Sequence, residues 1–128
     1  MTVRVLVVDD GPDVETLFRQ QFRREVRQEL YTLDFALSGK AALDILDGHI
    51  GEQIILLVSD INMPGMTGLE LVQVVKQRRP DLPAFMISAY GDQNSIATAL
   101  ARGADKFLTK PVDFPQLKRD IMAICPQA

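Results

Sequence analysis

Three aspartates and one lysine in this sequence combine side chains that can bind a cation and accept a chemical group. Asp9 and Asp10 follow an apolar run, Asp60 follows a second one and Lys110 follows a third. Carboxylates that lie close together repel one another unless a cation lies among them. Because no histidine or cysteine accompanies them, these oxygen ligands favour Mg²⁺ or another hard divalent ion such as Mn²⁺.

A carboxylate in that setting can also act as a nucleophile. An aspartate held ionised by a metal ion and a lysine can form an aspartyl phosphate. Ser88, which ends a further apolar run, and Lys110 would help to offset charge on the phosphoryl oxygens. The combination predicts phosphoryl transfer to Asp60.

The segments that must position these residues alternate between strand and helix patterns. Apolar or alternating runs predict strands at 3–8, 31–37, 54–58, 84–88 and 106–109. Between them, apolar residues at spacings of three and four predict helices. The first should be one long helix after Pro12, with an apolar stripe formed by Val14, Leu17, Phe18, Phe22, Val26 and Leu30. The others are expected after the N-cap Ser38, before Pro80, from Asp92 to Gly103, and from Phe114 to Ile124.

This alternation predicts an α/β fold, a single doubly wound (βα)5 domain of the flavodoxin-like kind over residues 1–128, with its core in 3–124. The common order of the five parallel strands, 2-1-3-4-5, makes strands one, three, four and five neighbours. Ligands of such sheets bind beyond the carboxyl ends of the strands. Asp9, Asp10, Asp60, Ser88 and Lys110 are therefore expected to meet there.

Composition excludes several classes of protein. The 128 residues carry a net charge of −3, which argues against a free-standing nucleic-acid binder. No apolar run approaches the length of a membrane span, and the first residues lack a signal-peptide pattern. With one cysteine, Cys125, no internal disulfide can form. A soluble cytoplasmic protein is expected.

Taken singly, each motif also has an ordinary structural explanation. Asp9-Asp10 alone is more often a turn and helix cap, and Ser88 alone is most often a hydrogen-bonded hydroxyl. Lys110-Pro111 alone is a weak signal because surface lysines are abundant. The arginines of the first helix are usually solvated, although they can also form a docking surface. The joint pattern is more specific, because each polar residue ends a different strand.

The combined motifs resemble the receiver domains of bacterial two-component response regulators over nearly the whole chain. The matching segments are Val7-Val8-Asp9-Asp10, the stretch from Ser59 to Gly68, Ile87-Ser88-Ala89, and the stretch from Gly103 to Pro111. The resemblance implies that Asp60 is the phosphoacceptor and that Lys110 pairs with a phosphoryl oxygen. It also implies that Asp10 and Asp60 bind Mg²⁺ directly, Asp9 through water, and Asn62 through its backbone carbonyl.

The same resemblance assigns a switch and two tuning positions. Ser88 resembles the hydroxyl that moves toward the phosphoryl group, and Phe107 resembles the aromatic residue that turns inward with it. Asn62 and Tyr90 occupy positions that tune the lifetime of the phosphorylated state. Pro111 is expected to follow a cis peptide bond.

The implied partners are a sensor histidine kinase or a histidine phosphotransfer protein, which docks near the first helix. The readout is expected on the face formed by the helix from Asp92, the strand 106–109 and the last helix. It would act on a downstream protein or a fused output domain absent from this chain, or through a phosphorylation-dependent homodimer. No direct contact with nucleic acid or membrane is expected. Gly11 departs from the family, which often has Glu there.

Three alternatives remain open at the level of sequence. A degenerate receiver would bind proteins without being phosphorylated. A phosphatase of the haloacid-dehalogenase type would also use a strand-end aspartate, but Asn62 stands where its general acid is needed. A flavodoxin-like binding module would need phosphate-binding backbone donors after the first strand, where Asp9-Asp10 would repel a phosphate. The leading interpretation is not an enzyme with a separate substrate, since a receiver catalyses only its own phosphorylation and dephosphorylation.

Overall fold

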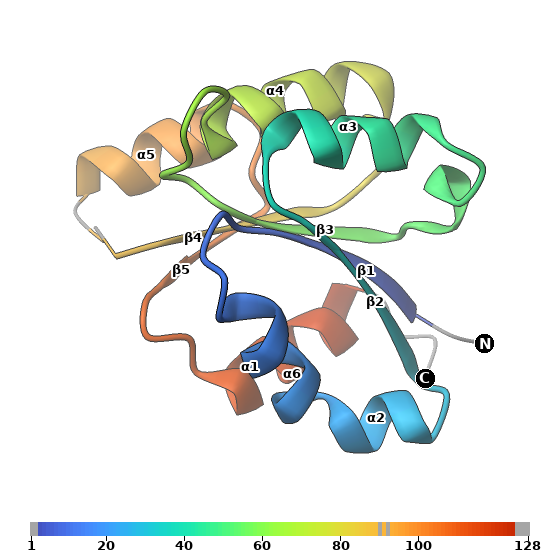
Figure 1. The fold of residues 1–128 in the computed structure, drawn as a ribbon. Coiled ribbons are helices and arrows are strands. Elements are labelled where there is room, and N and C mark those ends of the chain that lie inside the picture. Colours follow the sequence, from blue (N-terminus) through green and yellow to red (C-terminus); the bar gives the residue numbers. More distant parts are fainter. Residues whose placement is uncertain (1–2, 90, 92, 125–128) are drawn as a thin grey trace.

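A five-stranded parallel sheet forms the centre of the molecule (Figure 1). The structure, a computed structural model, describes residues 3–89, 91 and 93–124. The strand order is β2-β1-β3-β4-β5, so the predicted fold class and order are confirmed. The strands are β1 (Val3–Val8), β2 (Tyr31–Ala36), β3 (Leu56–Asp60), β4 (Ala84–Ser88) and β5 (Lys106–Thr109).

Helices cover both faces of the sheet (Figure 1). The helices are α1 (Val14–Gln21), α2 (Arg23–Arg27), α3 (Gly39–Asp47), α4 (Gly68–Arg78), α5 (Gln93–Ala101) and α6 (Phe114–Ile124), and a 3₁₀ turn, η1, spans Gly51–Gln53. Helices α1, α2 and α6 lie on one face, and α3, α4 and α5 lie on the other. Among the described residues, no helix is long and apolar enough to cross a membrane.

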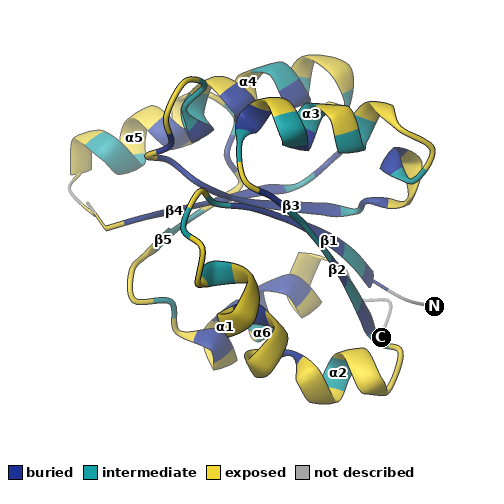
Figure 2. Cartoon of the chain, viewed as in Figure 1, coloured by how far each residue is buried: buried dark blue, intermediate teal, exposed yellow. Residues whose placement is uncertain are grey.

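Two apolar clusters hold these layers together, one on each face of the sheet. Successive strand residues point to opposite faces, so Val5 and Val7 join one cluster while Leu6 and Val8 join the other. Figure 2 shows that the strands are mostly buried and that exposed residues lie on the outer sides of the helices. Burial on both faces explains the nearly continuous apolar runs in the sequence.

The first predicted helix is not continuous, which corrects the prediction of one long helix. The chain bends at Phe22, whose backbone (φ −105°, ψ 10°) separates α1 from α2. Leu17 and Val26, placed on the apolar stripe from the sequence, are 43% and 39% exposed. The ring of Phe22 is buried against Tyr31 and Phe114, at centroid distances of 5.4 and 6.2 Å. We attribute the bend to this aromatic packing, which outweighs regular helix geometry.

The other element boundaries differ little from the predictions. Strand β3 begins and ends two residues later than the predicted 54–58, since Asp60 itself pairs with Ile87. Strand β2 ends at Ala36, one residue early, and Leu37 is 64% exposed. The predicted N-cap is confirmed, because the Ser38 hydroxyl accepts a hydrogen bond from the Ala41 N–H at 3.1 Å. Asp92, the predicted start of α5, lies outside the described residues.

Replacing Phe22 with alanine should destabilise the fold strongly. The side chain is 1% exposed and contacts three other aromatic rings. Removing a buried phenylalanine side chain typically costs about 3–5 kcal/mol. Urea unfolding of Phe22→Ala should show this loss, whereas Leu37→Ala, at an exposed site, should change stability by less than about 0.5 kcal/mol. Equal stabilities for the two variants would contradict the packing described here.

Candidate acidic site at the carboxyl edge of the sheet

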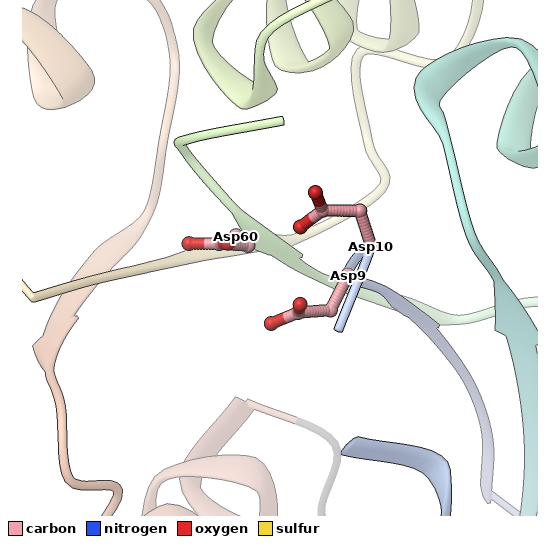
Figure 3. A group of neighbouring side chains, drawn as sticks. All are labelled: Asp9, Asp10 and Asp60. Carbon is pink, nitrogen blue, oxygen red and sulfur yellow. The ribbon is translucent and has the colours of Figure 1, made fainter. Parts of the chain in front are cut away.

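Three carboxylates meet where β1 and β3 end. The parallel register pairs Val8 with Ser59, which places Asp9 and Asp10 beside Asp60. One carboxylate oxygen from each aspartate lies within 4.8 Å of the other two. Figure 3 shows the three side chains at the ends of these two strands. Asp60 is buried, Asp9 is half-buried and Asp10 is exposed, so the cluster opens to solvent on one side.

Among the described residues, Lys110 carries the only ammonium group within 4 Å of this cluster. Its Nζ lies 3.5 Å from Asp60 Oδ2 and 3.5 Å from Asp9 Oδ2. The backbone N–H of Lys110 donates to the Ser88 carbonyl at 2.9 Å, which ties the end of β5 to β4. The Lys110–Pro111 peptide bond is cis, as the resemblance implied.

Burial and the neighbouring Asp9 carboxylate raise the pKa of Asp60 above its ordinary value of 3.8. Lys110 and a backbone hydrogen bond from Asn62 oppose this rise but do not cancel it. The pKa is raised because a partly desolvated carboxylate faces a second negative charge. Lys110 alone therefore does not offset the burial of Asp60 and the charge of Asp9.

The donor set fits a hard divalent cation. Every ligand atom in the cluster is a carboxylate oxygen, and Mg²⁺ and Mn²⁺ prefer oxygen ligands. Three carboxylates and one ammonium leave an excess of negative charge, which a divalent ion would offset. Asp9, Asp10 and Asp60 are the residues that would hold the ion.

The backbone around Asp60 is tightly enclosed, a feature that sequence reasoning missed. A Cβ on Gly68 would lie 2.1 Å from the Asp60 carbonyl oxygen, so only glycine fits at the first position of α4. The Gly68 N–H donates to the Ile61 carbonyl at 2.8 Å. Thr67 and Glu70 then cap α4 reciprocally. The available signal in the sequence is Gly68 itself, but a glycine shortly after a strand is typical of any turn.

Ser88 lies beside Asp60 on the neighbouring strand and is 1% exposed. The Asn62 side-chain amide donates to its hydroxyl at a long 3.4 Å. Both residues line a cavity of about 370 Å³ together with Asn94, Ser95 and Thr98 of α5. The Asn62–Ser88 contact was not predicted, because hydrophobic periodicity carries no information on side-chain pairs between loops and strands.

Phe107 lies on the same face of the sheet as Ser88. Met86 pairs with Phe107 and Ser88 pairs with Thr109, so these four residues share one face. Phe107 is partly buried against the apolar cluster beneath α3, α4 and α5. The two proposed switch residues therefore border the same layer of helices. Tyr90, the second predicted tuning residue, lies outside the described residues.

Gly11 contributes a backbone donor rather than a side chain. Its N–H donates to Asp9 Oδ1 at 2.8 Å, which orients that carboxylate beside Asp10 and Asp60. Where the resemblance often has Glu, this chain has no side chain, and the acidic cluster consists of Asp9, Asp10 and Asp60.

Fold and site together define a class: a doubly wound α/β domain with an acidic cluster and a lysine at the carboxyl edge of its sheet. The sequence profile described as "Response regulator receiver domain" matches residues 5–122. The chain belongs to the response regulator receiver domain family.

Relatives of known sequence agree with this assignment. The response regulator protein PilR of Pseudomonas aeruginosa is 38% identical over 115 residues, which cover 90% of this chain and 24% of PilR. Response regulator RppA of Synechocystis is 31% identical over 95% of this chain and 50% of its own length. An uncharacterized 14.6 kDa protein of Leptolyngbya boryana is 37% identical over 94% of this chain and 88% of its own. The chain thus spans a quarter to a half of the two named regulators.

Solved structures share the fold. The response regulator TrrA of Thermotoga maritima, in complex with Mg(2+)-BeF, superposes with a TM-score of 0.76 at 30% identity, covering 95% of this chain and 98% of that one. The BeF3-activated receiver domain of DrrB superposes with a TM-score of 0.84 at 20% identity, covering 99% and 100%. At that identity the second likeness bears on the fold alone.

The raised pKa of Asp60 predicts a pH-dependent effect of Asp60→Asn in EDTA. Because the folded-state pKa lies above the unfolded value, ionisation of Asp60 destabilises the fold as pH rises from 3.8 through the folded pKa. The neutral amide avoids this loss. Urea unfolding should therefore find Asp60→Asn more stable than the parent at neutral pH, with the difference shrinking as the solution is acidified.

The matched control is Asp44→Asn, which changes the same charge at an exposed position of α3. It should leave stability nearly unchanged across the same pH range. An Asp60→Asn variant that is less stable than the parent at neutral pH would show that the carboxylate is not destabilising.

Proposed function

We propose that this domain is a Mg²⁺-dependent switch that accepts a phosphoryl group on Asp60 from a histidine kinase or histidine phosphotransfer protein. The observation that carries the proposal is the meeting of Asp9, Asp10 and Asp60 with Lys110 at 3.5 Å. On this proposal the domain works in the cytoplasm and catalyses only its own phosphorylation and dephosphorylation. Asn62 and Tyr90 would tune how long the phosphoryl group remains.

The residues have complementary roles in the transfer. A carboxylate oxygen of Asp60 forms a bond to phosphorus, and the bond from phosphorus to the donor's imidazole nitrogen breaks, leaving its electron pair on that nitrogen. Lys110 balances negative charge on the phosphoryl oxygens, and it already lies next to Asp60 Oδ2. Asp9, Asp10, Asp60 and the Asn62 carbonyl would hold Mg²⁺. When bound, the ion neutralises charge on the transferred group.

The Ser88 hydroxyl would report the modification to the helix layer. It ends β4, the strand that pairs with Asp60 through Ile87, so a phosphoryl group on Asp60 would lie within reach of a short movement. Phe107 shares its face and would turn inward as Ser88 moves. Such a movement biases an equilibrium between two arrangements rather than creating a new one.

The readout surface would be the face formed by α5, β5 and α6. Leu100 on α5 and Met122 and Ile124 on α6 are exposed, at 47%, 37% and 36%. The partner would be a downstream protein, an output domain of a longer chain, or a second copy. This chain matches only part of the length of PilR and RppA, which supports an output domain as the partner.

Phosphorylation should require Asp60 and Mg²⁺. We expect intact mass spectrometry after incubation with acetyl phosphate and Mg²⁺ to show one added phosphoryl group, and none with Asp60→Asn or with EDTA. Asp44→Asn, the same chemical change on the α3 surface, should be labelled like the parent. Labelling of Asp60→Asn to the same extent would refute the assignment. Absence of both labelling and beryllofluoride binding in the parent would favour a degenerate receiver.

Ser88→Ala should separate modification from readout. Asp60 and Lys110 remain, so phosphorylation should persist, although more slowly because one hydrogen bond to the phosphoryl group is lost. With the hydroxyl gone, beryllofluoride should produce much smaller NMR shift changes at Phe107 and α5 than in the parent. Full-sized changes in Ser88→Ala would show that the signal reaches the helices by another route.

A further inference from the structure

Helix α2 carries a group of exposed arginines that the proposed phosphoryl chemistry does not use. Arg23, Arg24 and Arg27 are all exposed. Within the described part of the chain, Arg23 and Arg27 make no ion pair, whereas Arg19 pairs with Glu15 at 2.9 Å. Three arginines on one short helix form a concentrated positive surface.

This surface lies near the amino-terminal ends of β1 and β2, whereas Asp60 lies at the carboxyl-terminal end of β3. The loop after α2 is fixed beside the start of β1, since the Val3 N–H donates to the Leu30 carbonyl at 2.9 Å. The acidic cluster instead follows the carboxyl ends of β1 and β3. Figure 1 shows α2 next to the first residues of β2, away from the loops that follow β3 and β4. A partner bound at α2 would leave the phosphoryl site open.

A polar hollow of about 290 Å³ adjoins these arginines, lined by Gln20, Gln21, Arg23, Arg24, Glu25 and Lys118. Lys118 of α6 connects this hollow to α1 and α2. Lys118 Nζ donates to the Gln21 carbonyl at 2.7 Å and pairs with Glu25 at 2.8 Å. Because Lys118 offsets the Glu25 charge, Arg23 and Arg24 leave the lining of this hollow positive.

We propose that the α2 surface, formed by Arg23, Arg24 and Arg27 with the adjoining hollow, docks a short acidic segment of a partner protein. Residues 19–27 hold four arginines and one glutamate, a net charge of +3. Since the whole chain carries −3, the remaining residues together carry −6. Arginine forks suit carboxylate groups, which they can bind through two parallel hydrogen bonds.

The charge of the remaining chain favours a short segment over an extended polyanion. A nucleic acid or an anionic membrane would extend beyond α2, and the net charge of −6 on the remaining residues opposes its binding. Screening at physiological ionic strength acts over about 8 Å, so a ligand confined to the α2 surface would be attracted locally. A run of a few Asp or Glu residues matches this size and charge.

The proposal can be tested by titrating ¹⁵N-labelled protein with a capped oligoglutamate peptide at low salt. We expect amide shifts confined to α1, α2 and the start of α6. In Arg23→Gln/Arg27→Gln, the affinity should fall roughly threefold to tenfold, since exposed ion pairs contribute modestly. The matched control, Arg78→Gln/Arg102→Gln, removes the same charge from α4 and from the residue after α5, and should bind like the parent.

Two further arms decide between outcomes. Asp60→Asn should bind the peptide unchanged, so the result is independent of whether the phosphoryl site functions. Absence of shifts at α2, or equal losses in both double variants, would overturn the proposal. Tighter binding of an oligothymidine or of phosphatidylglycerol vesicles to the same arginines would show that the surface serves another class of partner.

Discussion

Mutual repulsion among three carboxylates is the constraint on which the site depends. The parallel register of β1 and β3 brings carboxylate oxygens of Asp9, Asp10 and Asp60 within 4.8 Å of one another, and a single lysine offsets only part of their charge. A folded chain tolerates this because two apolar clusters, one on each face, hold the strands in register regardless of charge at their ends. The repulsion makes the cluster receptive to a divalent cation and, with it, to an anionic group.

Asp60 contacts elements that connect it to other parts of the domain. Its backbone packs against Gly68 at the start of α4, and its strand neighbour leads to Ser88 at the end of β4. Ser88 in turn accepts, through its carbonyl, the hydrogen bond from the Lys110 N–H. Asp60 therefore contacts α4, β4 and the end of β5 directly, so a change in its charge or volume acts on all three. The arginines of α2 lie near the amino-terminal ends of the strands, outside this set of contacts.

The sequence predicted the sheet well because burial on both faces leaves a strong signal. The bounds of β1, β4 and β5 match the predictions. The alternation of strands and helices predicted a parallel sheet, and the strand order is the common one for such folds. The meeting of Asp9, Asp10 and Asp60 followed from that order alone, since strand ends converge at one edge. The prediction that Lys110 joins them required only that β5 lie next to β4.

What the sequence did not predict depends on packing between distant segments. The bend at Phe22 arises from aromatic contacts with Tyr31 and Phe114, which helix periodicity cannot register. The requirement for glycine at position 68 comes from the Asp60 carbonyl, a backbone atom of another element. The Asn62–Ser88 contact joins a loop to a strand end. Each is a tertiary effect that overrides a local pattern.

The most direct test of the central claim is to locate the phosphoryl group. Acyl phosphates are cleaved by borohydride, which converts the modified aspartate to homoserine and leaves unmodified carboxylates intact. After treatment with acetyl phosphate and Mg²⁺, peptide mass spectrometry should find homoserine at position 60 and aspartate at positions 9 and 10. Homoserine at position 9 or 10, with position 60 unchanged, would contradict the account.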